Sequence, residues 1–164
     1  MAEAPAWQDQ VYDLLREFNV SQFSYVPDAG HTVLINRSIA DPDVHSISVT
    51  TEEEGVAIQA GAHLGGARSV LLMQSSGVGN IMNSLAMPNT CRIPMLMIVT
   101  MRGEWGEFNS WQAPMGQGTP ACLEAMDVRI IRVDSAEEIP PAVKAASRLA
   151  FDGQQMVAVL ISQK

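Results

Sequence analysis

Three successive glutamates, Glu52, Glu53 and Glu54, open a segment built mostly from small apolar residues, TTEEEGVAIQAGAHLGG (50–66). Acidic side chains suit the first turn of a helix, and Thr51 with Glu54 has the spacing of a capping box. A carboxylate in this place could also hold or donate a proton. Successive helix residues point about 100° apart, so at most one of the three can face a given target. The small residues that follow would let another backbone approach closely.

Two further stretches carry polar residues or glycines directly after a predicted strand. Asp28 and His31 lie in SYVPDAGH (24–31), where turn formation or helix capping is the simpler interpretation. In VLLMQSSGVGN (70–80) a strand runs into a Gly-rich turn whose backbone N–H groups could contact a ligand. This turn lacks the GKS or GKT of a P-loop, and Met82 breaks the GxGxxG pattern.

A long loop is predicted at MRGEWGEFNSWQAPMGQGTP (101–120). Loops of this length in compact domains are usually functional or disordered, and two tryptophans and a phenylalanine argue against disorder. Arg102 could bind a carboxylate, sulfonate or phosphonate through two parallel hydrogen bonds. The alternative is an interface loop that carries aromatic anchors, and both interpretations can hold together.

The apolar pattern predicts the elements that position these stretches. Strands are predicted at 22–26, 45–49, 69–73, 95–100, 128–133 and 156–161. Helices are predicted at 8–18, 32–39, 52–65, 79–87, 120–126 and 137–151. This alternation favours an α/β fold, a single doubly wound domain over residues 1–164 with a mainly parallel sheet and helices on both faces. Ligands bind such sheets beyond the carboxyl ends of the strands, which selects loops 27–31, 50–54, 74–80 and 101–118.

Composition and charge limit the class of protein. Eighteen acidic and ten basic residues give a net charge of −8, which argues against nucleic acid as a partner. The longest apolar run, 93–101, is too short to span a bilayer, and MAEAPAWQDQVYDLL does not resemble a signal peptide. Cys91 and Cys122 lack metal-ligand spacing, so we expect reduced thiols in a cytoplasmic protein. Charged residues make up only 17% of the chain, so another subunit is expected to cover part of the surface.

Taken in order, these stretches resemble the pyrimidine-binding domain of thiamine diphosphate enzymes. The resemblance is strongest to the alpha subunit of sulfopyruvate decarboxylase and to the matching half of phosphonopyruvate decarboxylase. It covers nearly the whole chain, and its combination of motifs is specific although each piece alone is weak. The matching stretches are YVPD (25–28), TEEEGVAIQAGAHLGG (51–66), QSSGVGN (74–80), IPMLMIVTMRG (93–103) and WGEFNSWQAPMGQGTP (105–120).

The resemblance implies that one glutamate at the start of the 52–65 helix hydrogen-bonds N1′ of the cofactor's aminopyrimidine. Matching a Glu two residues before a Gly selects Glu53 as the catalytic and cofactor-binding residue, with Glu52 and Glu54 as first-turn charges. In this family the protonated N1′ favours the imino form of the ring, whose nitrogen removes the C2 proton. The carbanion then attacks a 2-oxo acid, and CO₂ leaves. A glutamate with this task should be desolvated.

The resemblance also implies roles for the other loops. The further cofactor contacts would be Ser76, Gly77, Gly79 and Asn80. Asp28 and His31 would lie near the reacting carbon as further catalytic residues. Arg102 and Ser75 would bind the substrate, with Arg102 at its anionic tail.

The motif that holds Mg²⁺ and the diphosphate in these enzymes, GDG followed by Asn, is missing from the sequence, and no metal ligands cluster in it. The resemblance therefore implies a hetero-oligomer whose beta subunit holds Mg²⁺ and shares the thiamine diphosphate. The expected reaction is the decarboxylation of sulfopyruvate to sulfoacetaldehyde. Three alternatives stay open: a phosphonopyruvate decarboxylase subunit that yields phosphonoacetaldehyde, another thiamine diphosphate enzyme of 2-oxo acids, and a non-catalytic partner subunit.

Overall fold

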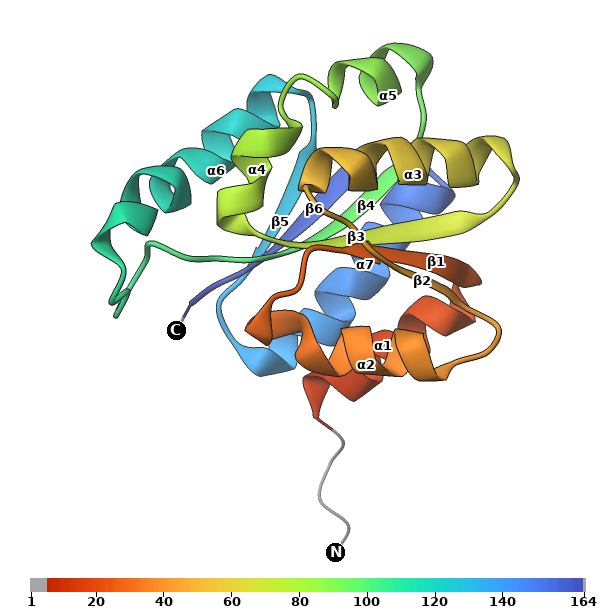
Figure 1. Ribbon diagram of the computed structural model, residues 1–164, viewed down its shortest axis with the longest axis horizontal. Helices are drawn as coiled ribbons and strands as arrows, with labels where there is room; N and C mark the ends of the chain where they lie inside the picture. Colours follow the sequence, from red (N-terminus) through yellow and green to blue (C-terminus); the bar gives the residue numbers. More distant parts are fainter. Residues whose placement is uncertain (1–5, 164) are drawn as a thin grey trace, which may run out of the picture.

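The predicted strands pair into one six-stranded sheet in which every neighbouring pair is parallel (Figure 1). The computed structural model describes residues 6–163, so the two ends of the predicted 1–164 domain lie outside the described residues. The strands are β1 (Val20–Tyr25), β2 (His45–Ser48), β3 (Arg68–Gln74), β4 (Met95–Thr100), β5 (Arg129–Val133) and β6 (Met156–Ile161). Their order across the sheet is β2-β1-β3-β4-β6-β5, which confirms the predicted α/β fold with its parallel sheet.

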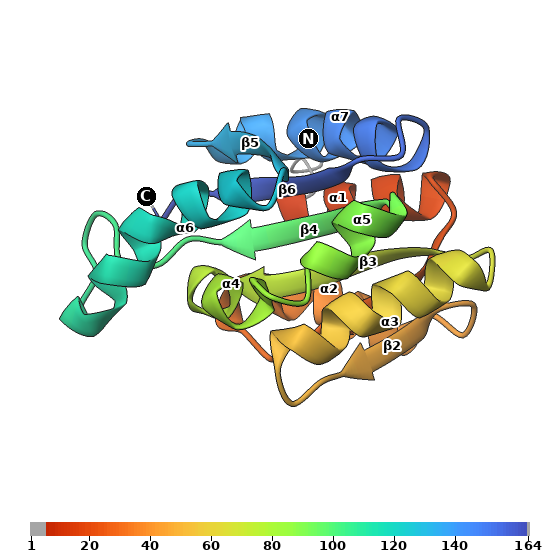
Figure 2. The same ribbon diagram turned by 90° about the horizontal axis from the view of Figure 1, so that it is seen from above.

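Helices cover both faces of the sheet (Figure 2). One face carries α1 (Trp7–Glu17), α2 (Thr32–Ala40) and α7 (Ile139–Phe151). The other carries α3 (Glu52–Leu64), α4 (Ser75–Ile81), α5 (Ala86–Cys91) and α6 (Ala113–Ala125). Alternate residues of a strand point to opposite faces, and β3 follows this rule. Leu72 packs with the first group of helices, and Leu71 packs with the second. Both are fully buried, as expected for a sheet covered on both sides.

Two predicted helix starts are wrong. Residues 74–80 do not form a loop, because α4 begins at Ser75 directly after the extended Gln74, and the predicted helix at 79–87 is replaced by α4 and α5. Helix α6 begins at Ala113 and not at Pro120. Pro114 occupies the first turn, where a missing backbone N–H costs little, whereas Pro120 lies inside the helix. These shifts matter because both helices border the candidate site.

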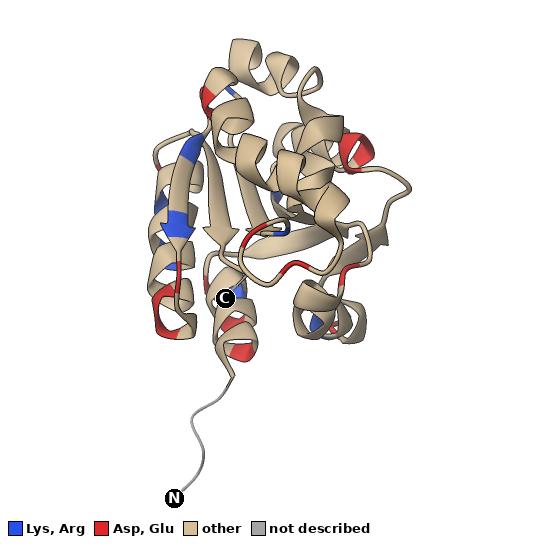
Figure 3. Ribbon diagram, turned by 90° about the vertical axis from the view of Figure 1, so that its left-hand side faces the viewer, with Lys and Arg blue, Asp and Glu red and all other residues tan. Residues whose placement is uncertain are grey.

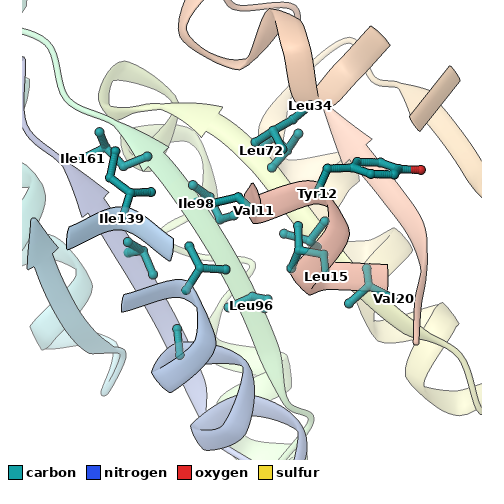
Figure 4. Close-up of a cluster of buried hydrophobic side chains, with 14 of the residues drawn as sticks. Val11, Tyr12, Leu15, Val20, Leu34, Leu72, Leu96, Ile98, Ile139 and Ile161 are labelled. Carbon is teal, nitrogen blue, oxygen red and sulfur yellow. The ribbon is translucent and has the colours of Figure 1, made fainter. Parts of the chain in front are cut away.

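The core between the sheet and its first group of helices is mostly aliphatic, and it includes the phenol ring of Tyr12 (Figure 4). Tyr12 of α1 is buried, stacks on Phe23 with ring centroids 5.5 Å apart, and donates a hydrogen bond of 2.9 Å to Asp41. Burial of the phenol, reinforced by this carboxylate, raises the pKa of Tyr12 to about 12. Tyr12 thereby ties α1 to the residue that follows α2.

This raised pKa predicts a loss of stability at alkaline pH. The contribution of Tyr12 is fully present below the unfolded-state pKa of about 10, and it is lost as the pH rises through the folded-state value of about 12. In urea titrations at increasing pH, the free energy of unfolding should therefore fall over this window. The free energy of unfolding of the Tyr12→Phe variant should fall less steeply over the same window. Equal slopes for the two proteins would show that Tyr12 makes no such contribution.

Candidate functional site

Glu52 is the glutamate that the first turn of α3 directs into the protein. Only 6% of its surface is exposed. Its Oε2 accepts a hydrogen bond of 2.9 Å from Nδ2 of Asn80 in α4. No residue within 6–163 donates a hydrogen bond to Oε1, so this oxygen is available to a donor from outside the chain. A nearly buried carboxylate with one free oxygen is a suitable acceptor for a ring N–H.

Glu53, the residue predicted to be desolvated, is exposed, so that expectation is wrong for the isolated chain. The inward face of α3 is formed by Glu52, Gly55, Val56, Gln59 and neighbouring small residues. These positions follow the i, i+3, i+4, i+7 spacing of one helix face, and Glu53 points about 100° away from Glu52. Glu54 is also exposed and caps the helix by accepting the N–H of Thr50 at 2.9 Å.

The absence of a side chain at Gly77 leaves the space that the Glu52 carboxylate occupies. A Cβ built on Gly77 would overlap Cδ and Oε1 of Glu52, so any larger residue would displace the carboxylate. Gly79, two residues further along α4, is exposed, and a Cβ built there would meet only the sulfur of Met115, at 3.3 Å. The structure thus brings Gly77 and Asn80 to Glu52, while the predicted contacts of Ser76, Gly77, Gly79 and Asn80 with the cofactor stay predictions.

Asp28 lies just beyond β1 and joins three strand ends. Its Oδ1 accepts a hydrogen bond of 3.1 Å from Gln74, and its Oδ2 accepts one of 2.7 Å from Thr100. Oε1 of Gln74 in turn accepts hydrogen bonds from Ser76 at 2.8 Å and from Gln112 at 3.2 Å. The hydroxyl of Ser76 is therefore engaged within this network. Gln74, Thr100 and Gln112 were not singled out in the sequence, where isolated polar residues at element ends give no distinctive signal.

His31 is completely buried, and its Nε2 lies 3.1 Å from the carbonyl oxygen of Met73. Burial lowers the pKa of His31, so the ring is neutral at neutral pH. A carbonyl oxygen only accepts, so Nε2 carries the proton. Nδ1 has no hydrogen-bond partner among residues 6–163. The predicted position of His31 near a reacting carbon stays a prediction.

Arg102 is paired with a carboxylate of its own loop. Its Nε and Nη2 donate to the two carboxylate oxygens of Glu107 at 2.7 and 2.6 Å, a bidentate pair. The predicted contact between Arg102 and a substrate tail stays a prediction, and Nε and Nη2 are already engaged by Glu107. Ser75 is buried, and its Oγ accepts the backbone N–H of Arg102 at 2.9 Å. Arg102 and Asp28 both line a cavity of 420 Å³ at the carboxyl ends of β1, β4 and β6, which Glu52 does not line.

Glu107 anchors the loop that follows β4. Besides Arg102, it accepts hydrogen bonds from the backbone N–H groups of Gly103 and Asn109 and from the side chain of Gln163. The Arg102 guanidinium, helped by these donors, holds the pKa of the Glu107 carboxyl far below its usual range. One carboxylate thus ties the loop to itself and to the residues after β6.

The depressed pKa of Glu107 predicts an acid-sensitive loop. Its contribution is fully present above the unfolded-state pKa of about 4.3 and is lost as the pH falls toward the much lower folded-state value. Glu107→Gln should release the loop at neutral pH and change the emission of Trp105 and Trp111. An unchanged emission spectrum, with equal acid sensitivity of mutant and parent, would contradict the anchoring role.

Within residues 6–163 no three side chains of His, Cys, Asp or Glu gather in a way that could hold a metal ion. None of the helices in this range is long and apolar enough to cross a membrane.

Among the curated relatives of this chain, some have about its length and others are much longer. Sulfopyruvate decarboxylase subunit alpha of Methanococcus maripaludis is 35% identical over 154 residues, which covers 93% of this chain and 92% of the relative. Sulfopyruvate decarboxylase of Methanosarcina acetivorans is 34% identical over 72% of this chain but only 30% of its own length. Phosphonopyruvate decarboxylase of Streptomyces viridochromogenes is 37% identical over 80% of this chain and 34% of its own length.

The fold and a family match agree with these relatives. A solved structure of 2-oxoglutarate:ferredoxin oxidoreductase from Magnetococcus marinus superposes with a TM-score of 0.74 and 18% identity. It covers 96% of this chain, while the chain spans 29% of that protein. Residues 6–119 match the family described as thiamine pyrophosphate enzyme, N-terminal TPP binding domain. The chain therefore belongs to the thiamine pyrophosphate enzymes, as a protein with their N-terminal cofactor-binding domain.

Proposed function

We propose that the protein is the alpha subunit of a thiamine diphosphate-dependent decarboxylase that converts sulfopyruvate to sulfoacetaldehyde and CO₂. The observation that carries this proposal is the end-to-end similarity to a sulfopyruvate decarboxylase subunit alpha. The buried carboxylate of Glu52 supports an enzyme over a non-catalytic partner subunit. A protein without chemistry gains little from burying an acid group that has a single hydrogen bond from the chain.

The residues around Glu52 fit the aminopyrimidine end of the cofactor. Oε1 is free to accept a ring N–H, Asn80 holds Oε2, and Gly77 leaves the space that the carboxylate occupies. When bound, thiamine diphosphate supplies the electron sink for removing CO₂ from a 2-oxo acid. The task of Glu52 is to hold and return the proton at the ring nitrogen. We therefore assign to Glu52 the role that the motif comparison gave to Glu53.

A partner subunit is the second part of the proposal. The sequence lacks the GDG and Asn motif for Mg²⁺ and diphosphate. Two relatives are single chains of which roughly two thirds lies outside the match, whereas the subunit alpha has the length of this chain. We infer that a beta subunit corresponds to this remaining part, holds Mg²⁺ and the diphosphate, and shares the cofactor with the alpha subunit.

Phosphonopyruvate is the second candidate substrate, because one relative of similar identity is a phosphonopyruvate decarboxylase. Sulfonate and phosphonate are both compact tetrahedral anions that similar donors bind. Arg102 is paired with Glu107 and is not assigned to this anion. The roles of Asp28 and His31 near the reacting carbon remain part of the proposal, and Asp28 is among the residues that line the 420 Å³ cavity.

Reconstitution tests the proposal. The chain is mixed with the candidate beta subunit, thiamine diphosphate and Mg²⁺, and aldehyde formation is followed with sulfopyruvate, phosphonopyruvate and pyruvate. The proposal predicts the highest kcat/KM with sulfopyruvate and no turnover by either chain alone. Highest kcat/KM with phosphonopyruvate would favour the second candidate. Absence of aldehyde from all three substrates would contradict the decarboxylase function.

A further inference from the structure

One side of the molecule carries almost no charge. Residues 75–91 and 108–123 contain no Asp, Glu, Lys or Arg, although the chain as a whole is acidic. These residues include α4, α5 and most of α6, and the ribbon over α4 and α6 is largely tan in Figure 3. Depletion of charged residues is a feature of the buried centre of protein interfaces. We call α4 (Ser75–Ile81) together with residues 108–123 the uncharged face, and Glu104 and Glu107 lie in the loop at its edge.

Three large aromatic side chains stand exposed at the edge of this face. Trp105, Phe108 and Trp111 are 84%, 85% and 70% exposed, and all lie within seven successive residues. An aromatic ring can bury about 150–250 Å² when it is covered, so the three together offer a large apolar contact. Trp is also among the residues that most often dominate binding energy.

The backbone that carries these rings is held in place. Glu107 accepts the hydrogen bonds described above. Glu104 forms an ion pair with Arg132 at 2.7 Å and accepts the backbone N–H of Gln163 at 3.0 Å. Gly103 has φ +72°, and a Cβ there would overlap the backbone of Gln112. The loop therefore closes tightly on the start of α6. An anchored loop loses little conformational entropy on binding, which favours affinity.

We propose that the uncharged face, with Trp105, Phe108 and Trp111 as anchors, is the docking surface for the beta subunit. This inference rests on the proposed function, because that function supplies the partner. Helix α4, which belongs to this face, also carries Gly77 and Asn80 next to Glu52. A subunit docked here would cover the site that the two chains are proposed to share.

The longer relatives favour a beta subunit, and not a second copy of this chain, as the partner on the uncharged face. The matching family is described as an N-terminal domain, so we infer that the remaining part of those relatives follows the part that this chain matches. In this chain, Gln163 after β6 hydrogen-bonds to both Glu104 and Glu107, in the loop that carries the exposed aromatic rings. A polypeptide that continues from β6 therefore leaves the domain beside the loop that carries the exposed aromatic rings.

Titration calorimetry with purified proteins tests the docking surface. The probe is the polypeptide from the same source whose sequence matches the remaining part of the longer relatives, with thiamine diphosphate and Mg²⁺ present. Trp105→Ser, Phe108→Ser and Trp111→Ser are compared with Ile39→Ser, which changes a side chain that is 60% exposed on α2, on the opposite side of the sheet. At least one of the three substitutions should weaken binding about tenfold or more, and Ile39→Ser should leave it unchanged. Circular dichroism spectra check that each variant is folded.

Amide hydrogen exchange gives a second reading without mutations, and residues 104–118 should become protected when the partner is added. Full affinity in all three aromatic variants, or no protection of this segment, would overturn the inference. So would loss of self-association with unchanged partner binding, which would assign the face to a second copy. If the parent pair binds through these residues but forms no aldehyde, the docking surface stands and the proposed function fails.

Discussion

Replacing Glu52 with glutamine is expected to lower kcat of the reconstituted decarboxylase by about 10²–10⁴-fold, the usual contribution of a positioned acid–base group. Gln has nearly the shape of Glu and can still accept the hydrogen bond from Asn80. It cannot hold and return a proton. The loss should therefore appear in kcat, with the thermal stability and the partner affinity close to those of the parent.

Glu53→Gln is the matched control for this prediction. Glu53 is the next residue, is exposed, and makes no hydrogen bond with another residue among 6–163. Its substitution should change kcat by less than about twofold, since surface substitutions away from a site have small effects. A large loss in Glu53→Gln with an active Glu52→Gln would reverse the assignment and restore the motif-based prediction.

Gly77→Ala is expected to separate activity from stability. The added Cβ overlaps Cγ, Cδ and Oε1 of Glu52, which lie toward the end of a flexible side chain. The side chain can move away at small cost in folding free energy, but its carboxylate then leaves its position. A displacement of about 1 Å can cost about 10²-fold in rate. We therefore expect kcat to fall about 10²-fold while the melting temperature changes little.

Gly61→Ala provides the control for the backbone effect of the same substitution. Gly61 lies in α3, and a Cβ there meets no atom within 4 Å. This variant should keep full activity and gain roughly 0.5–1 kcal/mol of stability from the reduced freedom of the unfolded chain. Full activity in Gly77→Ala as well would show that Gly77 does not set the position of Glu52.

The sheet could be predicted from the sequence because its strands are buried on both faces. The predicted runs 95–100 and 156–161 coincide with β4 (Met95–Thr100) and β6 (Met156–Ile161), which are continuous apolar segments between turn residues. The helix starts at Ser75 and Ala113 were missed. Glycines in α4 read as a turn, and Pro120 read as a helix start although the structure accommodates it within α6.

The motif and the helix period select different glutamates for the candidate site. Matching Glu to the following Gly selected Glu53, whereas the helix period selects Glu52, four residues before the buried Val56. That periodicity was available in the sequence and indicates which of the three glutamates is buried. The pairing of Arg102 with Glu107 was not available, because the chain between them folds back in a loop whose path depends on tertiary contacts.

The most direct test of the account is the rate at which the C2 proton of bound thiamine diphosphate exchanges with deuterium, measured by quenched-flow and proton NMR in the reconstituted pair without substrate. This rate reports the proton transfer that the Glu52 carboxylate is proposed to promote, independently of turnover. If Glu52 holds this proton, the exchange rate should be at least about 10²-fold slower in Glu52→Gln and unchanged in Glu53→Gln. An unchanged rate in Glu52→Gln would contradict this role.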